Sequence, residues 1–94
     1  MATMEYNVTT FGMSKIQKLT GKFLINPKSL RFRHLEKVLI NLGFLKIAAK
    51  GSHTKFKHEK LAHDLVIPVH NNDCKDFYKE LAKKLVIVNN LHKP

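Results

Sequence analysis

The chain has 94 residues, and its composition excludes several classes of protein. This length suffices for one domain with a modest core and is too short for two. A hydrophobic fraction of 44% with few glycines and prolines indicates a folded chain rather than a disordered one. Seventeen Lys and Arg against seven Asp and Glu give a net charge of +10, which in a small domain indicates binding to a polyanion, most often a nucleic acid. The alternative reading is that the charge only keeps the protein in solution.

Cysteine usage and hydropathy indicate a cytoplasmic protein. The single cysteine, Cys74, cannot form an internal disulfide. We find no apolar run typical of a secretory signal or of a membrane span. The apolar stripes of the predicted helices are ordinary core-facing ones, so binding to a membrane surface is not expected.

The N-terminal part of the chain predicts a tail followed by a helix. Residues 1–12 lack usable periodicity and are expected to form a loose tail. Ser14 and Gln17 have the spacing of a capping box, and apolar residues then recur on one helical face, which predicts a helix within residues 13–25. Residues 26–29, Asn-Pro-Lys-Ser, break the pattern and are expected to act as a connector to the next helix.

A second helix and three strands are expected in the middle of the chain. Four leucine and valine positions, 35, 38, 39 and 42, follow the helical repeat, and Gly43 supplies the stop. Strands are expected over residues 44–49, 53–58 and 64–70. Pro68 indicates that its end of the third strand lies at an edge or a bulge.

A last helix is predicted after a cap formed by residues 71–73, Asn-Asn-Asp. Its buried stripe is expected to be Phe77, Leu81 and Leu85. Residues 86–88 are compatible with the helix continuing or ending. The resulting order, α-α-β-β-β-α, defines an α+β fold in which a three-stranded antiparallel sheet has helices on one face and solvent on the other.

The alternating segment that begins at His53 carries the candidate site. Residues two apart in a strand share a face, so His53, Lys55 and Lys57 are expected on the open face of the sheet, while Thr54 and Phe56 face the helices. An imidazole, the side chain that titrates near neutrality, then lies beside two cations at the mouth of a glycine turn. Such a group can move protons next to a phosphate that the lysines hold.

An imidazole beside two lysines points towards RNA chemistry, and cleavage of RNA without a metal would require few groups. The 2′-hydroxyl is deprotonated, it attacks the phosphorus in line, and the leaving 5′-oxygen is protonated. A histidine suits either proton transfer, and lysines with free backbone amides can stabilise charge on the phosphoryl oxygens. His70 could supply the second proton transfer if the third strand brings it near His53. The residues expected to bind RNA are Lys50, Gly51, Ser52, Lys55 and Lys57.

These residues resemble the HicA toxins, small bacterial and archaeal mRNA interferases. The matching motifs are Gly43-Phe44 after a helix, Lys50-Gly51-Ser52-His53, Phe56, and the stretch Ile67-Pro68-Val69-His70. Residues 26–33 resemble the lead-in of a longer branch with an extra N-terminal helix. The resemblance spans roughly residues 30 to 86. Many family members start the last helix with proline-glycine-threonine-leucine, whereas this chain has Asn-Asp-Cys-Lys at residues 72–75.

The resemblance implies a fold like that of double-stranded RNA-binding domains for residues 26–94. It also implies endoribonuclease activity on mRNA, neutralisation by a HicB-like antitoxin, and a catalytic role for His53, the histidine after Gly-Ser. Because the last helix starts differently, it is expected to meet RNA or antitoxin differently. The alternative from another class is a non-catalytic RNA-binding module of the same fold, whose basic surface follows the phosphates across an A-form minor groove.

Neither a metal nor another cofactor is expected. The histidines at positions 53, 58, 63 and 70 are five or seven residues apart, whereas structural zinc favours closer ligand pairs and catalytic zinc often takes histidines one helical turn apart. Cys74 lies near a predicted helix start, a position that can lower the pKa of a thiol. No partner histidine is evident in the sequence, however, so a thiol nucleophile is not predicted.

Overall fold

The computed structural model describes residues 14–93 and shows the predicted α+β fold. The tail predicted at residues 1–12 lies outside the described residues. The elements in chain order are α2 (Lys15–Ile25), η1 (Pro27–Ser29), α3 (Phe32–Asn41), β1 (Leu45–Ala48), β2 (His53–Lys57), β3 (Leu65–Pro68) and α4 (Asp76–Val88). This sequence of elements confirms the expected order, with the 3₁₀ turn η1 inside the predicted connector.

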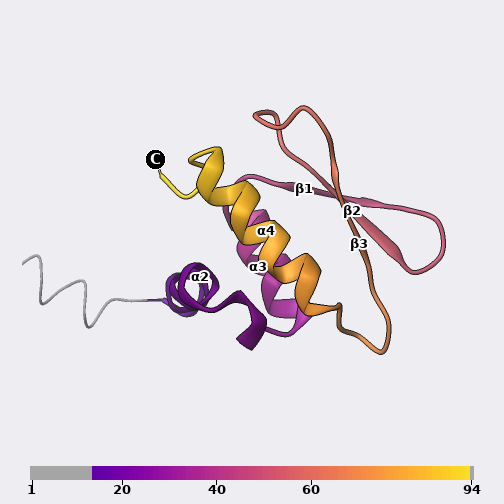
Figure 1. Ribbon diagram of the computed structural model, residues 1–94, viewed down its shortest axis with the longest axis horizontal. Helices are drawn as coiled ribbons and strands as arrows, with labels where there is room; N and C mark the ends of the chain where they lie inside the picture. The colour runs from indigo at the N-terminus through magenta and orange to yellow at the C-terminus, as the bar shows by residue number, and fades with distance from the viewer. Residues whose placement is uncertain (1–13, 94) are drawn as a thin grey trace, which may run out of the picture.

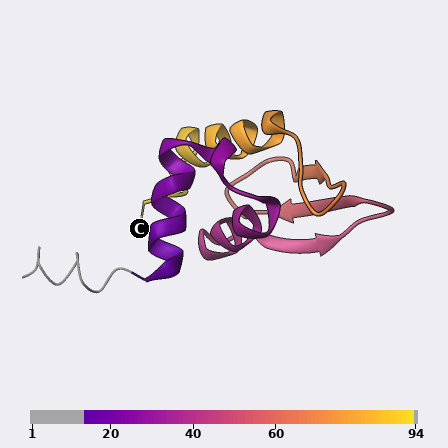
Figure 2. The same cartoon turned by 90° about the horizontal axis from the view of Figure 1, so that it is seen from below.

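The described part of the chain has three layers (Figure 1). The sheet is one outer layer, α3 and α4 cover one of its faces, and α2 lies beyond these helices, as the view from below also shows (Figure 2). The strands are antiparallel in the order β1-β2-β3, so β3 is an edge strand, as its proline predicted. The other face of the sheet is left open by these helices.

The helices α2 and α3 begin and end largely as the sequence predicts. Ser14 and Gln17 form the capping box, since the side chain of each accepts a hydrogen bond from the backbone N–H of the other. Gly43 follows α3 with a φ of +99°, the left-handed conformation that ends many helices. Phe44 then donates its N–H to the Leu39 carbonyl (3.0 Å), which completes the cap.

All three strands are shorter than predicted because turns take up their ends. Phe44 belongs to the cap of α3, so β1 starts one residue later. A turn over residues 58–61 follows β2. His70 and Asp73 exchange two backbone hydrogen bonds of 2.8 and 3.0 Å, which closes a turn where the third strand was expected to continue.

The predicted buried stripe and cap of α4 are both wrong. Phe77 is 66% exposed, and the buried positions are Lys79, Ala82 and Val86. The helix begins at Asp76, later than a cap at residues 71–73 requires, and its N-cap residue makes no side-chain hydrogen bond. The later start rotates the buried face, and the predicted Leu81 and Leu85 are half-buried at the margin of the core.

The core lies between the sheet and the helices and includes α2. Phe23 of α2, Leu35 of α3, Phe56 of β2 and Val86 of α4 are all fully buried in one cluster. The buried Phe23 ring thus packs α2 against the same core as the sheet and the other helices. Within residues 14–93, no helix has the length and apolar character that crossing a membrane requires.

Candidate functional site

His53 is the first residue of β2 and lies directly after a tight turn. The turn closes through a backbone hydrogen bond from the His53 N–H to the Lys50 carbonyl (3.4 Å). Gly51 has a φ of +66°, and a Cβ there would meet no atom within 4 Å. Glycine is therefore favoured at this position by backbone conformation and not by lack of space. The exposed imidazole begins the strand at the edge of this turn.

The two faces of β2 differ as the alternation predicts. Phe56 is fully buried against the helices, while His53 and Lys57 are exposed and Lys55 is half-buried. On the neighbouring strand, Lys46 pairs with Phe56 in the register and reaches α3. The histidine and two lysines therefore lie on the face that the helices leave open.

The cations of this face differ in their charge environment. The Lys55 ammonium lies 4.0 Å from an Asp64 carboxylate oxygen, so part of its charge is balanced within the protein. Lys50 and Lys57 form no ion pair within the part of the chain that the structure describes. The amides of Gly51 and Ser52 likewise donate no hydrogen bond to any described residue. These four groups therefore have no hydrogen-bond or ion-pair partner within the described residues.

His70 lies near the turn, but its imidazole is not joined to that of His53. Pro68 is the register partner of His53, and Val69 donates its N–H to the Ser52 carbonyl (2.8 Å). These contacts hold the segment before His70 against the glycine turn. Among the described residues no hydrogen bond links the two rings. His70 instead lines a hollow of about 260 Å³ between the end of β3 and the start of α4.

His58 is a structural histidine for which the sequence analysis predicted no role beyond excluding zinc. Its Nδ1 accepts a hydrogen bond from the Lys60 N–H (3.1 Å), so Nε2 carries the proton that is donated to the Leu42 carbonyl (3.1 Å). The Phe44 ring packs edge-on against it, with 4.9 Å between ring centroids. The strand alternation that buries Phe56 also buries position 58. This alternation could have predicted from the sequence that His58 is buried.

Cys74 is not an activated thiol, although it lies near the start of α4. Burial, with the nearby Asp73 and Asp76 carboxylates, raises the pKa of Cys74 to about 11, against an opposing effect of the Lys79 ammonium. The thiol is therefore protonated at neutral pH and unsuited to nucleophilic attack.

Asp73 is a structural residue that the sequence analysis placed in the wrong role. Its Oδ1 accepts hydrogen bonds from the backbone N–H groups of Phe32 (3.0 Å) and Cys74 (2.8 Å), and it lies 3.1 Å from the Lys79 ammonium. The carboxylate therefore caps α3, from 41 residues away in sequence, rather than α4. Only the fold brings these groups together.

Taken together, the open face displays cations and one imidazole on a small α+β domain, an arrangement typical of proteins that bind nucleic acid. No group of three His, Cys, Asp or Glu residues within residues 14–93 is placed to hold a metal ion. Residues 32–86 match the model of the family described as "HicA toxin of bacterial toxin-antitoxin". This match covers more than half of the chain, and the chain belongs to the HicA toxin family. The helix α2 precedes the matched segment. No curated protein and no solved structure matches the chain.

Proposed function

We propose that the protein is a toxin-type endoribonuclease that cleaves mRNA without a metal, with His53 as a proton-transfer residue. The observation that carries this proposal is the position of His53. It is exposed at the start of β2, on the open sheet face, in a domain of the HicA toxin family. Membership of a toxin family supports an RNA-directed activity, and the exposed imidazole supplies the group that such chemistry needs.

The proposed reaction is a transphosphorylation. The His53 imidazole takes the proton of a 2′-hydroxyl, whose oxygen attacks the adjacent phosphorus while the bond to the 5′-oxygen breaks. The leaving oxygen is protonated, and the RNA is left with a 2′,3′-cyclic phosphate and a 5′-hydroxyl. Lys50 and Lys57, with the free amides of Gly51 and Ser52, stabilise the negative charge on the phosphoryl oxygens. Lys55 contributes less because Asp64 lies beside it.

We assign the second proton transfer to His70. Its side chain is exposed, and the hydrogen bond between Val69 and Ser52 keeps its segment beside the turn that precedes His53. Among the described residues no hydrogen bond joins the two imidazoles, so this role requires RNA to bridge them or the 70–73 turn to shift. A His70→Ala variant is then expected to cleave more slowly than wild type but faster than His53→Ala.

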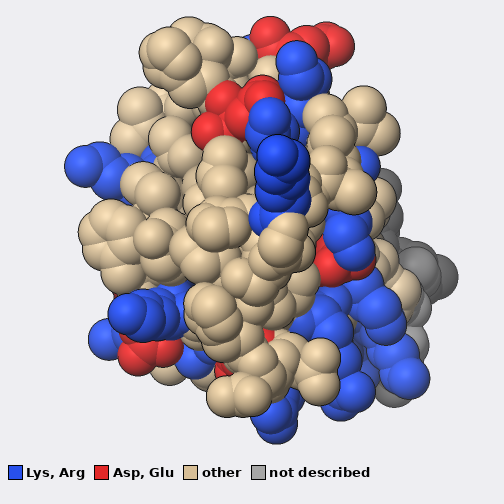
Figure 3. Space-filling view, turned by 90° about the vertical axis from the view of Figure 1, so that its right-hand side faces the viewer, with Lys and Arg blue, Asp and Glu red and all other residues tan. Residues whose placement is uncertain are grey.

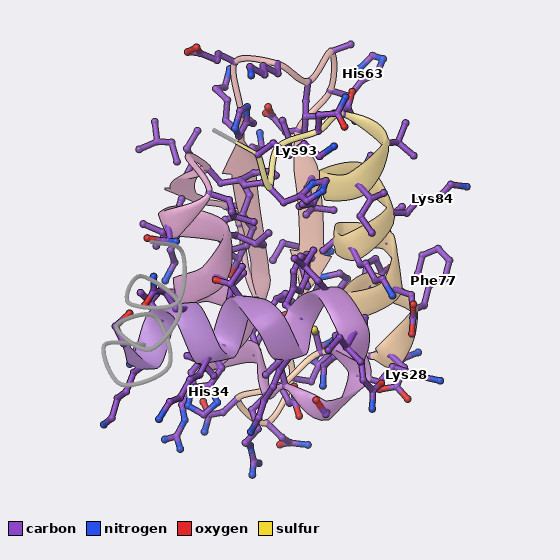
Figure 4. All side chains as sticks on the ribbon, turned by 90° about the vertical axis from the view of Figure 1, so that its left-hand side faces the viewer. Lys28, His34, His63, Phe77, Lys84 and Lys93 are labelled. Atoms are coloured by element: carbon purple, nitrogen blue, oxygen red, sulfur yellow. The ribbon has the colours of Figure 1, made fainter. Side chains whose placement is uncertain are left out.

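The test uses a long RNA incubated with each protein in EDTA. Wild type should cleave it and leave 2′,3′-cyclic phosphate ends, which end-group analysis of the fragments detects. His53→Ala should lose at least about 100-fold in rate. His63→Ala is the matched control, because His63 is an exposed histidine outside this site (Figure 4), and it should cleave like wild type. RNA that is bound by wild type but remains intact would contradict the nuclease and favour the non-catalytic RNA-binding module.

The open sheet face also suits a HicB-like antitoxin. Leu45 is 62% exposed and is the register partner of Lys57, and Val66 is 39% exposed opposite Lys55. Apolar side chains interleaved with cations fit an acidic protein partner, since complementary charge guides encounter and apolar contacts hold the complex. When an acidic HicB-like protein is added, hydrogen exchange should slow in β1 and β2 and at the residue 50–52 turn. Protection confined to the helical layers would contradict this footprint.

A further inference from the structure

A second basic surface lies on the opposite side of the molecule from the open sheet face. The helices α2 and α3 flank a groove of about 420 Å³ whose floor includes Ile16 and Leu19. The cationic rim consists of Lys15, Lys18, Lys22, His34 and Lys37. In Figure 4, side chains that end in nitrogen gather around the labelled His34, below α2 and away from the sheet. The α2 side of this groove precedes the segment that matches the HicA model.

The cations of this groove have no carboxylate partner among the described residues. Residues 14–57 carry eleven Lys and Arg but one acidic residue, Glu36. The Glu36 carboxylate is 3.0 Å from the Lys46 ammonium and is therefore already paired. The three lysines of α2 and Lys37 form no ion pair within residues 14–93. A concentrated, unbalanced positive potential is the signature of a surface that binds a polyanion.

The positive potential extends from the groove around the start of α3. Burial and the neighbouring cations, Arg33 and Lys37 first among them, lower the pKa of His34. Arg31 and Arg33 also flank a hollow of about 350 Å³ with Asn72, two residues beyond His70. The space-filling view shows a broad group of blue side chains at the lower right (Figure 3). Arg31 and Arg33 thus place two further cations between the start of α3 and the turn that follows β3.

We propose that the α2–α3 groove binds the phosphate backbone of RNA as a second contact, remote from His53. Lys15, Lys18 and Lys22 are spaced along one face of α2 and span about 10 Å. That distance corresponds to roughly three nucleotide steps of one strand, whereas a single bound phosphate would need donors that converge on one point. This inference rests on the proposed function and extends the RNA-binding surface beyond the sheet face. It does not require that the bound RNA be cleaved.

The groove is built on a rigid support, which makes it suited to binding. Phe23 anchors α2 in the core, and the capping box fixes the first turn of the helix. The lysines are exposed, so replacing them removes charge without disturbing the packing. Their effects on RNA binding can therefore be separated from effects on folding.

The test measures RNA binding by fluorescence anisotropy in EDTA, with His53→Ala in every protein so that cleavage plays no part. Lys18→Gln/Lys22→Gln should weaken binding by about tenfold to thirtyfold at 0.15 M salt and reduce the salt slope by about 1.5 to 2. The matched control, Lys84→Gln/Lys93→Gln, removes two exposed charges outside the groove. It should weaken binding by less than about threefold, because only the long-range attraction between the protein's net charge and RNA is reduced. Lys18→Arg/Lys22→Arg should bind like the parent protein.

NMR titration of His34 gives a second readout. Phosphates bound in the groove should raise its pKa from the lowered value of the free protein, since an anion favours the imidazolium. Equal losses from the groove and control variants, or an unchanged His34 titration on RNA saturation, would overturn the proposal. Binding of polyglutamate as tight as that of RNA, with the same dependence on Lys18 and Lys22, would assign the groove to an acidic protein instead. If the protein does not cleave RNA at all, these binding measurements are unaffected, so failure of the proposed nuclease function and failure of the groove can be told apart.

Discussion

His53 and Phe56 show how two residues of one strand take opposite roles. The Phe56 side chain is fully buried, with ring centroids 6.3 Å from Phe32 and 6.5 Å from Phe44, whereas the His53 imidazole faces solvent. Close packing requires a large apolar side chain at position 56, whereas the exposed position 53 is not constrained by packing. A histidine at an unpacked position is more readily explained by chemistry than by structure.

The first prediction compares the stability of these two positions. Phe56→Ala should cost about 3–5 kcal/mol of unfolding free energy, because it leaves a cavity beside the Phe32 and Phe44 rings. His53→Ala should change it by less than about 0.5 kcal/mol, because it removes few packing contacts. Urea denaturation at neutral pH gives both values. Equal midpoints for the two variants would mean that the faces of β2 are assigned wrongly.

The second prediction concerns His58, the buried histidine. His58→Ala should destabilise the protein by about 1–3 kcal/mol, because the Leu42 carbonyl and the Lys60 N–H both lose a partner. RNA cleavage by the fraction that stays folded should be retained, since His58 faces the helices. Thermal melting with a parallel cleavage assay provides the check, with His63→Ala as an exposed control. A stable but inactive His58→Ala protein would show that the catalytic histidine has been misidentified.

At the scale of elements, Asp73 couples the start of α3 to α4. The carboxylate accepts the Phe32 N–H and contacts the Lys79 ammonium, whose side chain is only 5% exposed. Burial by itself raises the pKa of Asp73, but hydrogen bonds from Cys74 and Lys79, the charge of Lys79 and the Phe32 N–H outweigh it and hold the pKa below its ordinary value. The ionised carboxylate is thus the form that the fold stabilises.

The third prediction follows from the sign of this shift. A carboxyl group whose pKa is depressed in the folded protein contributes stability above the pKa of the unfolded state. This contribution is lost as the pH falls through the lower pKa of the folded state. Asp73→Asn should therefore cost about 2 kcal/mol at pH 7 by leaving Lys79 buried without its charge partner. The difference in unfolding free energy between Asp73→Asn and wild type should be smaller at pH 3 than at pH 7. Glu80→Gln, an exposed carboxylate on the same helix, should show neither effect, and a pH-independent gap for Asp73→Asn would contradict the linkage.

The fourth prediction tests whether α2 belongs to the folding unit. Phe23 is fully buried, so Phe23→Ala should cost about 3–5 kcal/mol even though α2 precedes the segment that matches the HicA model. Ile25→Ala in the same helix is the control, because Ile25 is 81% exposed and should change stability little. A small effect of Phe23→Ala in chemical denaturation would mean that α2 packs only loosely on α3.

At the scale of the whole molecule, the sequence predicted those features that depend on local pattern. The capping box, the Leu35-Val38-Leu39 stripe, the Gly43 stop and the alternation of β2 are local, and all appear in the structure. The α4 stripe was predicted wrongly because Phe77 is apolar yet exposed, whereas Lys79 is charged yet buried. Lys79 is buried through contact with Asp73, in the turn before α4, and the same carboxylate caps α3. Periodicity cannot reveal these tertiary pairings.

The candidate site was predictable in part for the same reason. The side of β2 on which His53 and Lys57 lie follows from alternation, but the pairing of Lys55 with Asp64 depends on how the β2–β3 connection folds back. The α2–α3 groove could not be predicted in the same way, because it forms only where the two helices pack together. The excess of eleven Lys and Arg over one carboxylate in residues 14–57 is visible in the sequence. The roles of these residues in RNA cleavage and binding remain predictions.

The most direct test of the central claim is the single-turnover rate of RNA cleavage at saturating protein, in EDTA, for wild type and His53→Ala. Saturation removes differences in affinity, and folding is verified first by the melting temperature, so that the rate reports the chemical step alone. The account predicts that His53→Ala melts close to wild type, still binds RNA, and cleaves at least about 100-fold more slowly. A folded His53→Ala protein that cleaves bound RNA at the wild-type rate would contradict it.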